Sequence, residues 1–576
     1  MLSFIKQFPT ILNRNLKIKL IINLFFLILM PFLELVSIGS VGAVVLFVID
    51  LEKYFHLIPE YIVQNYLIDY QKVKILYFFG FLMISVIFLK NIFILYYSYW
   101  ESTLRRSISA YHSKLLFSSF VNESYLEHTM TSSSDKQNNI LNQSSKCSDY
   151  IFNSVMLLKE ILIAVILLTS LVFINFEATI SLFLIGIFIS LIFYIFSQKK
   201  TKLIGKIAKE KEFDLIDIVK NMFQGFKIII LYGKKNFYEK KFNEIIFFKN
   251  KYEVWQQVIQ KIPRLIFELV FAAVIVFILV GFINKDEDIK NILPFLIFLS
   301  LISIRLLPIF VNINVIISTL KYLEKPVEDL IDVLSKKCKV ISFQNKINTK
   351  NNYKFENIEK IEIKNLSFTY SNKDSMIIEN ISFKLKSNEM YALVGKTGAG
   401  KSTMLDLIVG MLTPVEGIIL ANDVDISNNF INWQKNVSYV PQDNFLLDDS
   451  ILNNICFLDE NIDKQRFNKV IEQAELSEFI NSLPDKEKTI VGDQGLRISG
   501  GQKQRLGLAR ALYHNKKFLA FDEATSAVDS ETEYNIMSTL QKVKKDKIII
   551  IIAHREATIN ACDAVLNLPS GKISVK

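Results

Sequence analysis

The chain has 576 residues, of which 51% are hydrophobic, and its formal net charge is +10. It is too long for one domain, and its mean hydropathy of +0.29 is too high for a protein that is soluble throughout. The excess of lysine and arginine lies beside hydrophobic runs, which predicts a lipid bilayer as partner and no nucleic acid.

Long apolar runs fill the first half of the chain. A helix that crosses a bilayer needs about 20 apolar residues, and six runs meet that length. We therefore predict a transmembrane domain over residues 1–320, a linker over 321–354 and a second domain over 355–576. The six predicted spans are residues 18–49, 75–99, 152–174, 178–197, 265–283 and 291–320.

The connections between the spans differ in charge. The N-terminus and the segment 198–264 are rich in lysine and arginine, whereas the connections near 174–178 and 284–290 are short and not basic. Basic loops stay on the cytoplasmic side of a membrane. We therefore expect the N-terminus, the second domain and the two long loops, about 100–151 and 198–264, in the cytoplasm.

The connection between the first two spans is rich in tyrosine. Apolar and aromatic side chains recur at helical spacing over residues 51–70. This pattern predicts either an amphipathic helix in the outer membrane interface or a helical extension packed on its neighbours.

Three cations lie in or at the edge of the predicted spans, namely Lys90, Arg264 and Arg305. A cation in a bilayer is costly unless water, a partner or a ligand compensates it. Arg264 has an alternative role, because its side chain can reach the interface from the start of its span. Glu34 in the first span is a candidate acidic partner, but one glutamate cannot neutralise two buried cations. The surplus predicts a positively charged cavity that suits an anionic phosphate group.

The second domain opens with the strongest motif of the chain. In YALVGKTGAGKSTMLDLIVGM, an apolar strand precedes a glycine-rich loop and an amphipathic helix. The glycines let backbone N–H groups approach phosphates, Lys401 neutralises phosphate oxygens and Ser402 can bind Mg²⁺. The predicted nucleotide-binding residues of this loop are Gly395, Lys396, Thr397, Gly398, Ala399, Gly400, Lys401, Ser402 and Thr403.

A second apolar strand, in KKFLAFDEATSAVD, ends in Asp522 and Glu523. The first carboxylate can bind Mg²⁺ and the second can orient an attacking water. Adjacent acidic residues also suit a simple cap, but the phosphate loop upstream favours catalysis. The sequence therefore predicts ATP and Mg²⁺ as cofactors.

The segment RISGGQKQRLGLARAL opens a basic helix with Ser499, Gly500, Gly501 and Gln502. It resembles the LSGGQ signature of ATP-binding-cassette (ABC) ATPases, with isoleucine in place of leucine. In that family the serine and glycines contact a γ-phosphate held by the other subunit. The resemblance therefore implies a dimer of half-transporters, which we expect to be a homodimer, with a heterodimer left open.

The resemblance to ABC exporters extends along the whole chain. It implies an all-α six-helix transmembrane domain followed by an α/β P-loop nucleotide-binding domain. It also implies coupling helices near 120–130 and 222–236, which sit on the ATPase domains, the second on the partner's. The roles it implies are adenine stacking for Tyr370, Mg²⁺ contact for Gln442 beside Ser402 and Asp522, a D-loop position for Asp529, and catalysis by Glu523, His554 and Gln442.

The membrane half has a narrower resemblance. The tyrosine-rich segment, IFLKNIFILYY, IPRLIFELVF and IRLLP are similar to PglK-type flippases of lipid-linked oligosaccharides. In that family basic residues in the cavity hold a pyrophosphate, which implies substrate contacts for Lys90, Arg264 and Arg305. Asn312 departs from the pattern, since a further cation is expected there.

The expected function is ATP-driven flipping of a polyprenyl-pyrophosphate saccharide, an amphipathic anionic lipid, across the bacterial cytoplasmic (inner) membrane. A peptide or hydrophobic-drug exporter is the alternative. A regulatory membrane protein with a non-hydrolysing cassette is a remote one.

Overall fold

The chain forms two compact units. The computed structural model describes residues 12–49, 72–172, 176–283, 308–335, 355, 357–370, 375–492, 495, 497–523 and 528–575. One unit, here called the helical unit, comprises Met1–Asn122 and Thr131–Ile341. The other, the α/β unit, comprises Glu123–Met130 and Ser342–Lys576.

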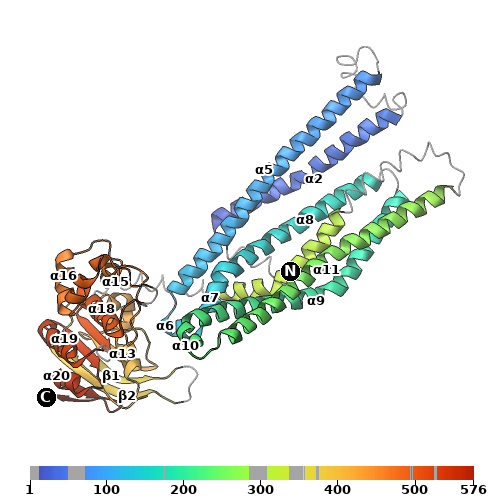
Figure 1. Cartoon of the computed structure of the whole chain (residues 1–576). Coiled ribbons are helices and arrows are strands. Elements are labelled where there is room, and N and C mark those ends of the chain that lie inside the picture. Colours follow the sequence, from blue (N-terminus) through green and yellow to red (C-terminus); the bar gives the residue numbers. More distant parts are fainter. Residues whose placement is uncertain are drawn as a thin grey trace. The chain divides into compact units, whose positions relative to one another are not determined.

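The helical unit consists of long helices in its described residues (Figure 1). Four of them are long and apolar enough to cross a membrane, and they overlap the first four predicted spans. The predicted span 265–283 lies at the end of a fifth long helix. The helices are α2 (Arg14–Ile49), α5 (Lys72–Val121), α7 (Ser133–Asn138), the π-helix η2 (Asn139–Gln143), α8 (Ser144–Val172), α9 (Phe176–Gln224), α10 (Phe226–Leu231), α11 (Lys235–Ile283) and a helix over residues 308–335.

Two of the sequence-based expectations lie outside the described residues. These are the tyrosine-rich segment 51–70 and the first part of the predicted span 291–320, which contains Arg305.

The helices of this unit pack in neighbouring pairs, with α2 alongside α5 and α9 alongside α11 (Figure 1). The helix over 308–335 continues past residue 320, where we expected a linker to begin. Residues 321–335 of this helix are amphipathic and not uniformly apolar. A prediction based on long apolar runs therefore ends the helix too early. The buried face of this segment consists of Leu323, Val327, Leu330, Ile331 and Leu334.

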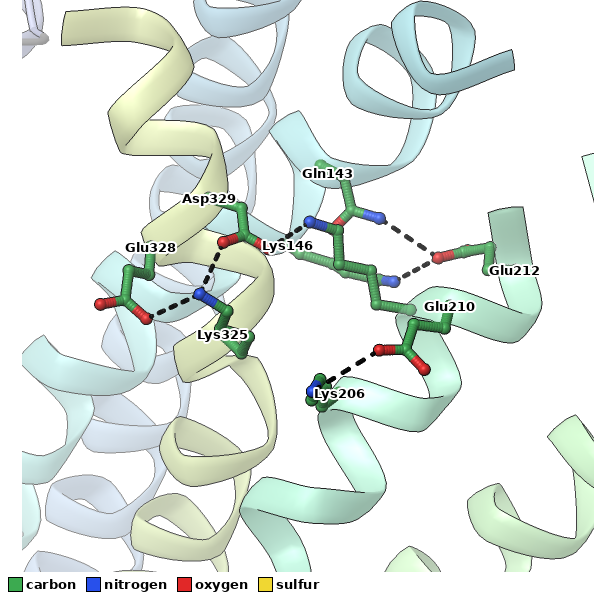
Figure 2. Close-up of polar contacts among 9 residues, drawn as sticks. Gln143, Lys146, Lys206, Glu210, Glu212, Lys325, Glu328 and Asp329 are labelled. Atoms are coloured by element: carbon green, nitrogen blue, oxygen red, sulfur yellow. Dashed lines mark hydrogen bonds and ion pairs between the residues drawn. The ribbon is translucent and has the colours of Figure 1, made fainter. Parts of the chain in front are cut away.

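Outside the predicted spans, polar contacts join α8, α9, the π-helix η2 and the helix over 308–335 (Figure 2). Lys146 of α8 lies 2.5 Å from Glu212 of α9, which also accepts a hydrogen bond of 3.3 Å from Gln143 of the π-helix. Asp329 pairs at 2.5 Å with Lys209 of α9 and at 2.8 Å with Lys325. Such charged contacts are typical of helix extensions in water rather than in lipid.

The α/β unit contains two sheets. A four-stranded antiparallel sheet has the order β2-β1-β4-β5, and a six-stranded sheet has the order β10-β9-β3-β8-β7-β6. The strands are β1 (Lys360–Phe368), β2 (Ile378–Lys386), β3 (Glu389–Val394), β4 (Glu416–Ala421), β5 (Val424–Asp425), β6 (Val437–Val440), β7 (Phe518–Asp522), β8 (Ile548–Ile552), β9 (Ala564–Asn567) and β10 (Lys572–Val575).

Helices complete this unit. They are α6 (Tyr125–Met130), α13 (Lys401–Ile408), the 3-10 helix η3 (Ile426–Asn429), α14 (Phe430–Gln434), α15 (Ile451–Cys456), α16 (Lys464–Gln473), α17 (Ser477–Ser482), the 3-10 helix η4 (Lys486–Lys488), α18 (Gly500–Tyr513), α19 (Ser530–Val543) and α20 (Glu556–Ala561).

The six-stranded sheet separates two hydrophobic cores. Strand β8 consists of five isoleucines, all buried. Ile548, Ile550 and Ile552 belong to one core, and Ile549 and Ile551 belong to the other. A parallel strand that is buried on both faces has this continuously apolar sequence, because successive side chains point to opposite sides. The central strands are therefore rigid supports for the loops at their ends.

One short segment from the first half of the chain belongs to the α/β unit. Helix α6 lies within the predicted coupling segment 120–130, and Leu126 packs against the core of this unit. Burial and the nearby charge of Asp406 raise the pKa of Tyr125.

Candidate active site

The predicted ATPase residues follow the carboxyl ends of adjacent strands. Strands β3, β8, β7 and β6 are parallel neighbours. Leu393 and Asp522 both pair with Ile552, so these three strands end at one level. The glycine-rich loop, Gln442, Glu523 and His554 come directly after these ends. In open α/β sheets this edge is where ligands bind.

The glycine-rich loop joins β3 to α13. Gly398 and Gly400 have φ angles of +84° and +85°, in the left-handed region that favours glycine. Gly400 is the N-cap of α13 and leaves the first N–H groups of the helix without a side-chain cap. Exposed N–H groups at a helix start bind phosphate. Lys401 is buried and donates hydrogen bonds to the carbonyl oxygens of Gly395 at 2.9 Å and Lys396 at 3.2 Å, so its ammonium is held over the loop.

Ser402 and Asp522 form the candidate metal site. Burial raises the pKa of the Asp522 carboxyl, a hydrogen bond from Ser402 opposes this, and the charge of Glu523 adds to the rise. A divalent cation would relieve the repulsion between the two carboxylates. In the described part of the chain, no cluster of three His, Cys, Asp or Glu side chains can hold a metal by itself. This donor set fits Mg²⁺, which binds through few protein oxygens together with the phosphates of a nucleotide.

The Glu523 carboxylate is held from two sides. Gln442 Nε2 donates a hydrogen bond of 2.9 Å to Oε2, and His554 Nε2 lies 3.1 Å from Oε1. Gln504 Nε2 also donates to the backbone carbonyl oxygen of Glu523 at 3.4 Å. Glu523 itself has a φ of +50°, which is uncommon for a residue with a side chain and typical of functional sites. A carboxylate fixed in this way can orient a water molecule and accept its proton.

Two further polar residues, Asp406 and Tyr439, lie beside this site and were missed by the sequence reasoning. Burial and the charge of Asp522 raise the pKa of Asp406 to about 6. Burial, with the charges of Asp406 and Asp522, also raises the pKa of Tyr439. Asp406 follows Ser402 by four residues, so both lie on one face of α13. That spacing was the available signal.

The signature and D-loop residues have local structural roles in this chain. Ser499 is the N-cap of α18, where its side chain accepts from Gln502 N at 3.2 Å and its N–H donates to Gln502 Oε1 at 2.8 Å. This reciprocal pair is a capping box. Asp529 caps α19 by accepting hydrogen bonds from Thr532. Tyr370 packs edge-on against Phe368, with ring centroids 5.1 Å apart.

The predicted substrate cations have acidic neighbours where they are described. Lys90 is buried, and its Nζ lies 3.5 Å from Glu34 Oε2 and 3.4 Å from Ser37 Oγ. Arg264 Nε lies 2.8 Å from Glu268 Oε1 on the same helix. Asn312, where a further cation was expected, donates a hydrogen bond of 3.3 Å to Glu160. Arg305 lies outside the described residues.

Comparison with known proteins gives consistent matches. The ABC transporter family model matches residues 378–526. An export ATP-binding/permease protein of Rickettsia typhi is 31% identical over 74% of this chain and 72% of its own length. An ATP-dependent lipid A-core flippase of Haemophilus influenzae is 30% identical over 71% of this chain and 68% of its own. The structure of a bacterial Atm1-family ABC exporter with ATP bound has the same fold, with a TM-score of 0.73, 20% identity and coverage of 96% of this chain and 94% of that one.

Proposed function

The chain belongs to the ABC exporter family as a half-transporter that couples ATP hydrolysis to transport, and from this premise we propose that it flips a polyprenyl-pyrophosphate-linked oligosaccharide outward across the bacterial cytoplasmic membrane. The observation that supports the hydrolytic part is the Glu523 carboxylate held between Gln442 and His554. The six spans and the cytoplasmic position of the α/β unit are part of this proposal.

Each residue of the site has a separate role in ATP hydrolysis. Backbone N–H groups of the loop and the Lys401 ammonium bind the β- and γ-phosphates. Ser402 and Asp522 would hold Mg²⁺, which would neutralise phosphate charge. Glu523 takes the proton of the attacking water, while Gln442 and His554 keep its carboxylate in place. Tyr370 stacks on the adenine.

A homodimer completes two such sites. In such a dimer the start of α18, where Ser499 caps its own helix through Gln502, faces the phosphate loop of the other subunit. Helix α10, within the predicted second coupling segment, exposes Phe226, Ile228 and Leu231 at 49%, 62% and 73%. An apolar face of this kind supports docking onto another protein surface, which we assign to the partner's α/β unit.

Two observations support a lipid with an anionic head as the cargo. A relative of this chain is named a lipid A-core flippase, so lipid flipping has a precedent among its relatives. Lys90 is buried in a helix that can cross the membrane, and its two polar contacts, at 3.5 Å and 3.4 Å, are long. Charge-assisted contacts are usually shorter, about 2.7–2.9 Å. Lys90 is therefore held loosely enough to exchange Glu34 for a phosphate oxygen.

Reconstitution in liposomes tests the proposal. A fluorescent polyprenyl-pyrophosphate oligosaccharide in the ATPase-facing leaflet should move to the other leaflet with ATP and Mg²⁺, and should stimulate ATP hydrolysis. The Glu523→Gln variant, which keeps the nucleotide pocket, serves as the inactive control. Stimulation and transport by a simple peptide or a hydrophobic drug, with no effect of the oligosaccharide lipid, would replace the proposed cargo with that of the alternative exporter.

A further inference from the structure

A groove between α9 and α11 has no part in the roles assigned above. Its volume is about 350 Å³, within the range of ligand pockets. The lining is aliphatic and aromatic, with one serine and one lysine. The residues that define it are Ile189, Phe193, Phe196 and Lys200 of α9 and Trp255 and Ile266 of α11.

The groove has an apolar end and a charged end. Because α10 joins α9 to α11, these helices run in opposite directions, which places Ile189 near Ile266 and Lys200 near Trp255. The helix rise from residue 189 to residue 200 is about 16 Å at 1.5 Å per residue. One leaflet provides about 15 Å of the hydrocarbon core. The groove therefore has the length of a single leaflet.

The outer wall of the groove is open in the chain. Phe196 is 76% exposed and Trp255 is 52% exposed. Lys200 is also exposed, and no acidic side chain in the described part of the chain pairs with it. By contrast, Lys202 forms an ion pair with Glu324, with 3.6 Å between Nζ and Oε2. Lys200 therefore places a positive charge that can bind an anion at the charged end of the apolar groove.

We propose that this groove binds one acyl chain of an anionic phospholipid of the cytoplasmic leaflet, with the lipid phosphate at Lys200. The proposal rests on the cytoplasmic position of the α/β unit given above, because that orientation places Lys200 at the cytoplasmic interface. The apolar walls suit an acyl chain, tryptophan is favoured at the membrane interface, and a lysine there attracts anionic lipid. The bound lipid is a component of the surrounding bilayer, distinct from the transported cargo.

Tryptophan quenching in nanodiscs tests this site. The chain has three tryptophans. Trp433 is fully buried in the α/β unit and gives a constant background, so the Trp100→Phe variant leaves Trp255 as the reporter. Two samples of phosphatidylcholine nanodiscs are prepared. One contains a small fraction of brominated phosphatidylglycerol, and the other contains the same fraction of brominated phosphatidylcholine. We expect brominated phosphatidylglycerol to occupy the groove about fivefold more readily than brominated phosphatidylcholine. An attraction of about 1 kcal/mol per lysine implies this preference.

Two matched variants identify the cation. In the same background, Lys200→Ala should abolish the preference for phosphatidylglycerol, and Lys199→Ala, which removes a neighbouring exposed lysine outside the groove lining, should keep it. Equal quenching by both lipids, or a preference unchanged in Lys200→Ala, would overturn the site. Absence of quenching by either lipid would also overturn the site, because the groove would then be closed to lipid. ATP hydrolysis is measured on the same samples, so normal hydrolysis without lipid preference counts against the lipid site alone.

Discussion

Glu523 Oε1 lies 3.1 Å from His554 Nε2, across the ends of two neighbouring parallel strands. Because the histidine fixes the carboxylate that accepts the proton of water, both residues should affect the hydrolytic step more than nucleotide binding. We expect Glu523→Gln to lower the rate of ATP hydrolysis by about 10²- to 10⁴-fold, the usual contribution of a general base. His554→Ala should lower it comparably, while both variants still bind ATP, as a fluorescent ATP analogue would report.

Gln504→Ala is the matched control for Glu523, since the Gln504 side-chain amide donates a hydrogen bond to the backbone carbonyl oxygen of Glu523. It should reduce hydrolysis much less. Full hydrolysis by Glu523→Gln would remove Glu523 from the catalytic set.

Asp406 should make the stability of the α/β unit depend on pH. Its pKa is raised to about 6 from 3.8, so the folded state holds its proton more tightly than the unfolded chain. Its ionised form therefore destabilises the fold, fully above about pH 6 and progressively less as pH falls toward 4. We expect Asp406→Asn to stabilise the protein at pH 8 by about 1 kcal/mol after allowance for partial exposure.

The measurement is the apparent melting temperature without ATP or Mg²⁺, at pH 8 and at pH 5. The gain from Asp406→Asn should shrink at pH 5. Asp448→Asn, a change at an exposed position, should have no such effect. An equal gain at both pH values would show that the carboxyl is not the cause.

The ATPase part of the site was predictable because its signals are local. A strand, a glycine-rich loop and a helix follow one another in the sequence, and so do an apolar strand and two carboxylates. The fold and the family expected from them are confirmed. Ser499 shows the limit of a motif, because Ser499 and Gln502 of the signature also form a capping box.

Contacts between distant segments were less predictable. Glu34 could be named as a candidate partner for Lys90, but the contact itself depends on the packing of α2 on α5. The charge of Asp522, at the end of a strand, acts on Asp406 in a helix more than a hundred positions earlier in the chain. No pattern in the sequence predicts that these two residues are close. The continuation of the helix over 308–335 past residue 320 was missed because its last described turns are amphipathic.

Mixing experiments should show that the two ATP sites act together. If each site needs Lys401 from one chain and Ser499 from the other, and both sites must work, dimers with one Lys401→Ala chain are inactive. At equal amounts of wild-type and variant chains, only about a quarter of randomly formed dimers are fully wild type. We expect ATP hydrolysis to fall to about that fraction. A fall to one half would indicate sites that work independently.

The pair of Lys90 and Glu34 allows stability to be separated from cargo binding. Lys90→Met removes this cation from Glu34, a half-buried carboxylate, and should destabilise the helical unit by less than the about 3–5 kcal/mol of a fully buried pair. The double variant Lys90→Met, Glu34→Gln should recover most of this loss, as thermal unfolding in detergent would report. If Lys90 binds the pyrophosphate, the stable double variant should still flip the lipid poorly. Normal flipping by the double variant would remove Lys90 from the substrate site.

Gly205 sets the distance between α9 and the helix over 308–335. A Cβ atom at this position would lie 2.0 Å from the carbonyl oxygen of Tyr322, a backbone atom that cannot move without shifting its helix. Gly205→Ala should therefore destabilise the helical unit by about 1–3 kcal/mol, as expected for overpacking, and lower the melting temperature in detergent. Gly80→Ala in α5 is the matched control, because a Cβ there meets no atom within 4 Å. It should be neutral or stabilise the helix by up to about 1 kcal/mol. Equal melting temperatures for the two variants would mean that α9 and the 308–335 helix are not in close contact at Gly205.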